Sequence, residues 1–501
     1  MKKKCVKAIG IIAVQGIIIL LTATLCSAKD WHVRPSGHTY GAGTGATYND
    51  ALSGFARIPW ASVNPGDRIY ISGTFNESLT FPKSGTAGNL ITVYGNGYAS
   101  DPGIISVSSG NAVNMNNREY VAIDGITINR AGTTGVYMQS SAHCEVKNCG
   151  IYGIGASGSG YGVDGRYAQG MYIYNNRMTN EKGTFNGAGV VANLGNMMQV
   201  ATSTIDKNYI YGTNVDGIIP GNDCVVSRNT VGGATNMTSH ADGIVIYGSR
   251  VLCKQNTVFS CTQGIYPNTF DMGGSSVAVC DDVTIADNVV YQTSLMAAMN
   301  GILAQVWRGP RSSMKRLKIY NNTVVAVNQY GIHIADDNAG GSLFDGLQIY
   351  NNIVIDCGTR TSTGNISVLV NGSIPNLRID YNLVGHYHTP GYRNYKYMGT
   401  FYTQAQMRSL GFETHGVENP TLSTIFRKYG YQASDNDLSL PAGSPAIGLG
   451  VNIGSAYAYD RNGTNRSVSG NWDAGAYAYG SVPDGSTNRP SPPKNLRKVV
   501  L

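Results

Sequence analysis

The sequence predicts an all-β protein whose strands coil into a right-handed parallel β-helix, a solenoid with a cap at its N-terminal end and a short helix and tail after it. An Asn followed by small apolar residues recurs every 21 to 34 residues, and a second series, in which Gly precedes an apolar run, alternates with it. Such a unit cannot bury its apolar face alone, but stacked copies bury one continuous core. The 64 Gly and the low charged fraction of 13% fit many short strands joined by tight turns.

Residues 1–28 are predicted to be a secretory signal peptide. Four Lys precede an apolar run from Ile9 to Leu25, and small residues follow, with cleavage expected after Ala28. The alternative is a retained membrane anchor, although Gln15 and Gly16 interrupt the run. We therefore expect a protein that is exported to the extracellular space or periplasm and has no membrane span after cleavage.

Residues 29–103 are expected to form the N-terminal cap and the first turns of the coil. The segment "YNDALSGFA", residues 48–56, predicts a short amphipathic helix over the open end, and "NPGDRIYISGTF" predicts the first turn of the coil. A cap is needed because the end of a coil is an exposed sheet edge.

Residues 104–385 are expected to form the coil itself. An Asn at the same point of every turn predicts a ladder in which each side-chain amide bonds its neighbours and the turn backbone. The predicted ladder positions are Asn148, Asn176, Asn208, Asn229, Asn256, Asn288, Asn322, Asn352 and Asn382.

The second series brings two carboxylates together. Asp216 and Asp242 each precede the Gly that opens an apolar run, and they stand 13 and 14 residues before their ladder Asn. On stacked turns they lie one above the other, flanked by Gln263 and Asn300. Two stacked like charges are unfavourable unless they share a proton, bind a cation or face a basic group. The alternative interpretation is that Asp is simply a favoured turn residue before Gly.

The C-terminal part is divided at two points. Residues 386–480 contain the end of a Tyr-rich loop and the close of the domain, and within them Thr403 and Gln406 predict a capping box for a short helix that Gly411 ends. Residues 481–501, rich in Pro, Ser and Asn, predict a linker or tail.

Charge and cysteine content exclude several classes. The signal takes four of the 37 Lys and Arg, so 33 basic residues remain against 30 acidic ones, a net charge of +3. This weak charge does not favour a nucleic-acid partner. Seven Cys remain, with no C-x-x-C pair, so neither a zinc ribbon nor a redox motif is expected; Cys253 and Cys261 are either a disulfide or two buried thiols.

These turns resemble those of the secreted right-handed parallel β-helix superfamily that includes pectate lyases, alginate lyases, polygalacturonases and mannuronan epimerases. The resemblance covers roughly residues 30–480 and rests on the "xGI…N-x-V" turns, the "NPGDRIYISGT" opening and the "SPAIGLG…WDAGAY" close. It implies a carbohydrate-active protein acting as a monomer on an acidic polysaccharide.

A group of charged and aromatic side chains around Asp216 and Asp242 marks the candidate site. If the protein is a lyase, Ca²⁺ is the expected cofactor, and a basic residue takes the C5 proton of a uronate during β-elimination. If it is a glycoside hydrolase, the two Asp are acid and base or nucleophile. The expected catalytic residues are Arg250, His240, Lys254, Asp216 and Asp242, the metal ligands are Asp216, Asp242 and Asp223, and the substrate contacts are Tyr247, Gln263, Tyr266 and Asn300.

The resemblance is incomplete at the site. "NVDG" at 214–217 is similar to the Asn-Thr-Asp-Gly of polygalacturonases, but the paired Asp, the Gly-His-Gly and the Arg-x-Lys of that family are missing. The Asp-Pro-His-Asp of mannuronan epimerases is absent as well. The sequence thus favours a polysaccharide lyase, with a glycoside hydrolase and a non-catalytic glycan-binding or surface protein as alternatives.

Overall fold

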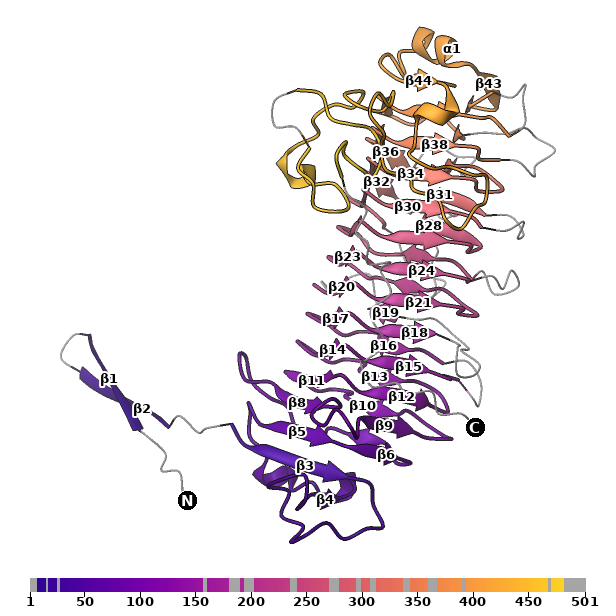
Figure 1. Cartoon of the computed structure of the whole chain (residues 1–501). Helices are drawn as coiled ribbons and strands as arrows, with labels where there is room; N and C mark the ends of the chain where they lie inside the picture. Colours follow the sequence, from indigo (N-terminus) through magenta and orange to yellow (C-terminus); the bar gives the residue numbers. More distant parts are fainter. Residues whose placement is uncertain are drawn as a thin grey trace.

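The computed structural model shows a long coil in which three parallel sheets run side by side (Figure 1). It describes residues 7–14, 17–24, 28–155, 160–179, 190–192, 202–234, 241–269, 279–293, 299–306, 312–336, 343–358, 367–388, 393–466 and 470–481. The chain visits sheet 1, sheet 2 and sheet 3 in that order in each turn, and every turn pairs with the next in parallel register. This is the predicted parallel β-helix.

Sheet 1 begins at the N-terminal end with the cap strand β4 and runs through most of the coil. Its strands are β4 (Leu52–Ser53), β3 (Asp30–Arg34), β5 (Arg68–Ile71), β8 (Ile91–Tyr94), β11 (Val121–Asp124), β14 (Glu145–Lys147), β17 (Tyr172–Tyr174), β20 (Thr204–Asp206), β23 (Val225–Ser227), β26 (Leu252–Lys254), β29 (Thr284–Ala286), β33 (Lys318–Tyr320), β37 (Gln348–Tyr350) and β40 (Arg378–Asp380).

Sheet 2 follows sheet 1 after the Asn turn. Its strands are β6 (Gly73–Phe75), β9 (Gly103–Ser106), β12 (Thr127–Arg130), β15 (Gly150–Tyr152), β18 (Arg177–Thr179), β21 (Tyr209–Tyr211), β24 (Thr230–Gly232), β27 (Thr257–Phe259), β30 (Val289–Tyr291), β34 (Thr323–Val325), β38 (Ile353–Ile355), β41 (Leu383–Gly385) and β44 (Val417–Glu418).

Sheet 3 completes each turn. Its strands are β7 (Leu79–Thr80), β10 (Val113–Asn114), β13 (Val136–Tyr137), β16 (Val163–Gly165), β19 (Val190–Ala192), β22 (Ile218–Ile219), β25 (Ile244–Ile246), β28 (Gln263–Pro267), β31 (Asn300–Val306), β35 (Ile332–Asp336), β39 (Val368–Val370), β42 (Tyr395–Tyr397) and the antiparallel β43 (Thr400–Tyr402).

The remaining elements are short. Strands β1 (Lys7–Val14) and β2 (Ile17–Thr24) form an antiparallel pair, and β32 (Met314–Lys315) pairs with β36 (Phe344–Asp345). No helix in the described part of the chain has the length and apolarity that a membrane span requires. The signal peptide stays a prediction, and residues 482–501 of the expected tail lie outside the described residues.

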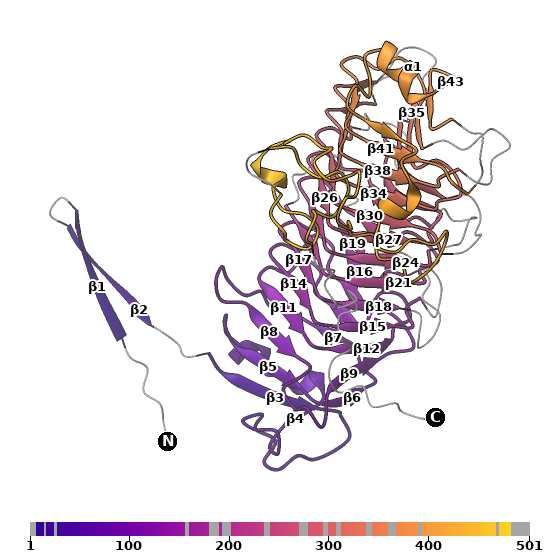
Figure 2. The ribbon, with the colours of Figure 1, turned by 45° about the horizontal axis from the view of Figure 1, so that its top comes forward.

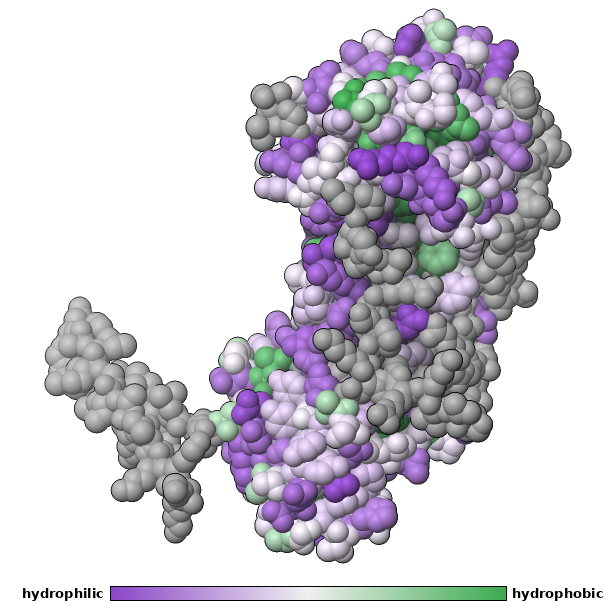
Figure 3. Space-filling model, in the orientation of Figure 1, coloured by the Kyte–Doolittle hydropathy of each residue, from purple (hydrophilic) through white to green (hydrophobic). Residues whose placement is uncertain are grey.

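The core lies inside the coil because strand residues alternate between its interior and its exterior. Ile205, Val226, Cys253 and Ile285, on successive strands of sheet 1, are all fully buried. All seven described Cys are buried free thiols, so Cys253 and Cys261 are not a disulfide, and burial raises the pKa of the Cys261 thiol to about 12. On the face in Figure 3, hydrophilic side chains predominate and apolar ones form small separate patches.

The Asn ladder forms as predicted from Asn176 to Asn382. Each of these Asn is buried, and its backbone and side-chain nitrogens donate to the Oδ1 of the next Asn, as Asn229 does to Asn256 at 2.9 and 3.0 Å. Asn148 was predicted wrongly, because the ladder position of its turn belongs to Cys149, whose backbone N–H donates to Asn176 Oδ1. At the other end the buried carboxylate of Glu413 accepts the last bonds from Asn382.

Of the two short helices predicted at the ends of the coil, the structure contains the C-terminal one only. Helix α1 (Gln404–Ser409) begins at Thr403 with the predicted capping box, and Gly411 follows it at a φ of 87°. The helix expected over residues 48–56 is wrong. Leu52 instead pairs with Val33 in sheet 1, and Gly54, at a φ of 86°, turns the chain into a 3-10 turn, Phe55–Arg57. Further 3-10 turns are Trp60–Ser62, Leu422–Thr424 and Ser455–Tyr457.

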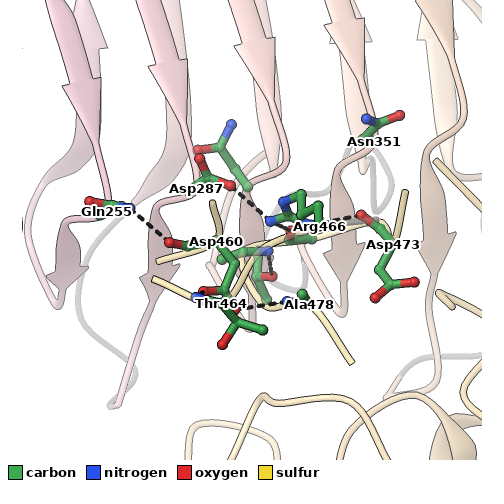
Figure 4. Close-up of polar contacts among 12 residues, drawn as sticks. Gln255, Asp287, Asn351, Asp460, Thr464, Arg466, Asp473 and Ala478 are labelled. Atoms are coloured by element: carbon green, nitrogen blue, oxygen red, sulfur yellow. Dashed lines mark hydrogen bonds and ion pairs between the residues drawn. The ribbon is translucent and has the colours of Figure 1, made fainter. Parts of the chain in front are cut away.

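The C-terminal segment, residues 421–466 and 470–481, packs on the outer face of sheet 2 in the C-terminal half of the coil (Figures 1 and 2). Its apolar residues bury Val289, Val325, Ile353 and Ile355. Its polar contacts join the turns that precede sheet 2, as Figure 4 shows. Gln255 donates to the Asp460 carbonyl at 2.7 Å, and Arg466 donates to Asp287 at 2.8 Å in an ion pair with both side chains buried. This part of sheet 2 is therefore covered.

Candidate functional site

The candidate site lies at the outer face of sheet 3. Residues that point outward from four neighbouring strands, Ile219, Val245, Tyr266 and Leu303, form a buried apolar cluster together with Ala335. Two further rings, Tyr161 and Tyr247, pack against this cluster and remain partly exposed. Of this group, only the rings of Tyr161 and Tyr247 reach the surface, where the apolar face of a sugar ring can pack against them.

Asp216 and Asp242 are brought together as the repeat alignment predicts. They stand two residues before β22 and β25, which are neighbours in sheet 3. The backbone N–H of Asp242 donates to Asp216 Oδ1 at 3.0 Å, and within the described residues nothing bonds Oδ1 of Asp242. Their exposed fractions are only 9% and 2%. The two carboxyl groups therefore stack at the edge of the outer face.

Burial raises the pKa of both carboxyl groups. Desolvation raises the pKa of Asp216 to about 7, although the N–H of Asp242 lowers it. Desolvation and the neighbouring Asp216 charge raise the pKa of Asp242 to about 9, against the hydrogen bond from the backbone of Gln263. Two coupled acids with separated pKa values carry one proton between them over that interval.

The four predicted substrate contacts lie along the same edge and face. Asn300 Nδ2 donates to Gln263 Oε1 at 2.8 Å, so these two amides continue the stack that the two Asp begin. The Tyr266 hydroxyl donates to Gln305 Oε1 at 2.5 Å. Burial and then the Asp216 charge raise the pKa of Tyr247, so the phenol lies within electrostatic range of the carboxyl pair.

The predicted basic residues lie elsewhere. Arg250 and Asp223 occupy turns before sheet 1, at the other end of the sheet 3 strands from Asp242 and Asp216. Arg250 Nε donates to Asp223 Oδ1 at 2.6 Å, and this hydrogen bond raises the pKa of the guanidinium, the opposite of what a base requires. Arg250 does follow the strand that Asp242 opens, but β25 separates the two residues, so its role as the base stays a prediction without a contact to support it.

The other predicted residues are separated as well. Lys254 belongs to β26 of sheet 1, where its charge acts on Asp287 under the C-terminal segment. His240 lies outside the described residues. The described residues contain no group of three His, Cys, Asp or Glu side chains that could hold a metal ion. Asp223 does not join Asp216 and Asp242, so Ca²⁺ binding stays a prediction for two carboxyl groups.

Sequence reasoning missed a second polar cluster on this face. Asp164 of β16 points outward yet is only 1% exposed, and Arg166 binds it through Nε at 3.0 Å and Nη2 at 2.8 Å. Gln139 donates to Asp164 Oδ2 at 2.8 Å. The available signal was the Asp-x-Arg spacing, because residues i and i+2 of a strand lie on one face of the sheet.

Comparisons with known proteins agree on the fold. The family described as "Right handed beta helix region" matches residues 111–271. No curated protein matches the sequence. The structure titled "The complex structure of XylC with xylose" has 9% identity and a TM-score of 0.50, covering 90% of this chain and 98% of that one.

Two lyase structures are similar at lower scores. Pectate lyase Pel9A has 16% identity and a TM-score of 0.46, covering 91% of this chain and 97% of that one. An alginate lyase from Paenibacillus sp. str. FPU-7 has 19% identity and a TM-score of 0.40, covering 58% of this chain and 95% of that one. At these identities the likeness concerns the fold alone. From its sheet topology, its repeats and the family match over residues 111–271, the chain is a right-handed parallel β-helix.

Proposed function

We propose that this protein is an exported glycoside hydrolase that cleaves a polysaccharide bound along the outer face of sheet 3. The observation that carries the proposal is the pair Asp216 and Asp242, which the bond from the Asp242 N–H to Asp216 Oδ1 joins on neighbouring turns and whose pKa values rise to about 7 and about 9. Glycoside hydrolysis needs one protonated and one ionised carboxyl group at the same pH.

The two carboxyl groups take different roles. Asp242, with the higher pKa, donates its proton to the glycosidic oxygen, while the Asp216 carboxylate attacks the anomeric carbon. Water then cleaves the glycosyl ester and returns a proton to Asp242. Neighbouring strands lie about 4.8 Å apart, close to the roughly 5–5.5 Å separation of carboxyl groups in retaining enzymes. We therefore expect products that keep the anomeric configuration.

The pH dependence follows from the same pair. Activity requires an ionised Asp216, which forms as the pH rises through about 7, and a protonated Asp242, which is lost as the pH rises through about 9. We expect a bell-shaped dependence of activity on pH, with its maximum between these values. Its two apparent pKa values describe the coupled pair and not either residue alone.

β-Elimination on a uronate polymer is the second candidate. The outer face of sheet 3 carries the cation Arg166, which could neutralise a sugar carboxylate. The basic residue that would take the C5 proton is not identified among the described residues. The third possibility is glycan binding without cleavage, which the low exposure of Asp216 and Asp242 favours.

One assay separates these functions. The purified protein is incubated with a panel of neutral and acidic polysaccharides, and both reducing ends and the absorbance of unsaturated ends are followed. We expect saturated reducing ends, with a loss of about 100-fold or more in Asp242→Asn and Asp216→Asn. Asp223→Asn is the control, because it removes a carboxylate of the same turns that lies away from the pair. If the products have unsaturated ends, the reaction is β-elimination and not hydrolysis. If the protein binds a polysaccharide but releases no product, it is a glycan-binding protein.

A further inference from the structure

We propose that Arg166, held by Asp164, forms an anion-binding subsite that recognises a carboxylate group on the bound glycan. The inference rests on the proposed function, because it takes the glycan to lie across the strands of sheet 3. It adds a residue of this chain that determines specificity for acidic over neutral sugars.

The subsite lies on the same face as the candidate site. Asp164 is paired with Tyr137 on one side and with Val191 on the other, and Val191 pairs with Ile219 of the apolar cluster. Two strand spacings, roughly 10 Å, therefore separate Asp164 from Ile219. Tyr161 joins the two places, because it packs against the apolar cluster and also lies 4.9 Å from the Arg166 guanidinium.

The hydrogen bonds of the cluster use up its acceptors. Asp164 Oδ1 accepts from the backbone N–H and Nε of Arg166, and Oδ2 accepts from Arg166 Nη2 and Gln139 Nε2. A carboxylate has about four acceptor sites, so Asp164 is saturated. The Oε1 of Gln139 in turn accepts from the Tyr137 hydroxyl at 3.0 Å. The acceptor in each of these hydrogen bonds is therefore Asp164 or Gln139, the residue whose amide donates to Asp164.

The donors that remain belong to Arg166. Among the described residues, none accepts a hydrogen bond from its Nη1, and Nη2 has a second N–H. The Arg166 side chain is 34% exposed, whereas that of Asp164 is 1% exposed, so the guanidinium is the part of the ion pair that meets solvent. A site that offers donors requires a ligand that brings acceptors, and the Nη1–Nη2 edge fits the two oxygens of a carboxylate.

Asp164 and Tyr161 hold the guanidinium in place. The two bonds to Asp164 fix its plane, and the ring of Tyr161 lies beside it. An arginine fixed before binding loses less side-chain entropy when it meets its ligand. Arg166 can therefore discriminate a uronate from a neutral sugar at that position.

Binding of defined oligosaccharides tests the proposal. The probes are tetrasaccharides of galacturonate and of mannuronate and their methyl esters, which keep the sugar shape and lack the charge. Calorimetry on the full mature chain should give an acid-form Kd that is weakened about 10-fold or more by Arg166→Gln, the value of one charge-assisted contact. Binding of the esters should change less than about twofold, and added salt should reduce the difference.

Arg228→Gln is the matched control. Arg228 binds the buried Asp206 through Nε and Nη2 in the same way, but on the outer face of sheet 1. The double variant Asp164→Asn/Arg166→Gln also removes the buried carboxylate, so it tests binding where the single variant fails to fold. Equal weakening of acid and ester, an effect of Arg228→Gln as large as that of Arg166→Gln, or no binding of either acid would overturn the proposal. Charge-selective binding through Arg166 without cleavage would uphold the subsite while refuting the hydrolase.

Discussion

Replacing Asp242 by Asn should make the protein more stable, by an amount that grows with pH. The side chains have the same shape, and an amide fits the stack, since Asn300 already donates to Gln263 there at 2.8 Å. The wild-type carboxyl keeps its proton in the folded state up to a pH of about 9, whereas in the unfolded chain it ionises at its ordinary value of 3.8.

The sign follows from proton linkage. Because the folded pKa is raised, the stabilising contribution of Asp242 is fully present below pH 3.8 and is lost as the pH rises toward 9. One proton changes the free energy of unfolding by about 1.4 kcal/mol per pH unit. Between pH 5 and 7 the wild type should therefore lose up to about 3 kcal/mol that Asp242→Asn retains.

Urea unfolding at pH 5, 6 and 7 measures this difference. A repeat protein can unfold in parts. The free energies are therefore compared only where tryptophan fluorescence and circular dichroism report the same single transition. Asp223→Asn is the control: it breaks an ion pair with the half-exposed Arg250 and should cost about 1 kcal/mol or less.

A stability gap that stays constant with pH would refute the account of Asp242 as a buried neutral acid. If Asp242→Asn instead becomes less stable than the wild type as the pH rises, the two carboxyl groups are ionised in the folded protein. A bound cation would stabilise such an ionised pair. In that case millimolar Ca²⁺ should raise the thermal midpoint of the wild type and not that of Asp216→Asn/Asp242→Asn.

Three further variants test other parts of the structure. Arg250→Ala should leave glycan cleavage within about twofold of the wild type, since Arg250 pairs with Asp223; a loss of product would return Arg250 to the catalytic residues. Asn256→Ala should lower the free energy of unfolding by about 2–4 kcal/mol, because it removes bonds to Asn288 and Val226 inside the ladder; an unchanged urea midpoint would contradict this. Arg466→Ala should cost about 3–5 kcal/mol by leaving Asp287 buried without its partner, and should speed proteolysis of the C-terminal segment; adding Asp287→Asn should recover part of the loss.

The coil and its ladder could be predicted because every turn repeats the same local pattern. The repeat also aligned Asp216 with Asp242, since neighbouring turns differ little in length. The error at Asn148 was one residue: "VKNCGI" has a single Asn where "YNNRMT" has two, and only the backbone shows which of the two positions points inward.

The placement of Arg250 could not be read in the same way. Arg250 and Asp223 both have positive φ, near 57° and 56°, in turns that send the chain from sheet 3 to sheet 1. Their distance from the carboxyl pair depends on these turns and not on sequence separation. Asp164 and Arg166 were missed for a related reason, because their turn differs in length and the Asp-Gly of "VDG" falls inside the strand.

The contacts of the C-terminal segment have a consequence for the order of folding. The segment bonds Gln255, Asp287, Thr323 and Asn351, which belong to four successive turns, across sequence separations of 100 to 205 residues. The turns can form one after another as the chain emerges, but the segment can dock only when all four are complete. Until then Val289, Val325, Ile353 and Ile355 face solvent as an apolar strip on an unfinished sheet. A chain that stops before residue 421 should consequently aggregate, and in the full chain the late docking step should compete with this concentration-dependent aggregation.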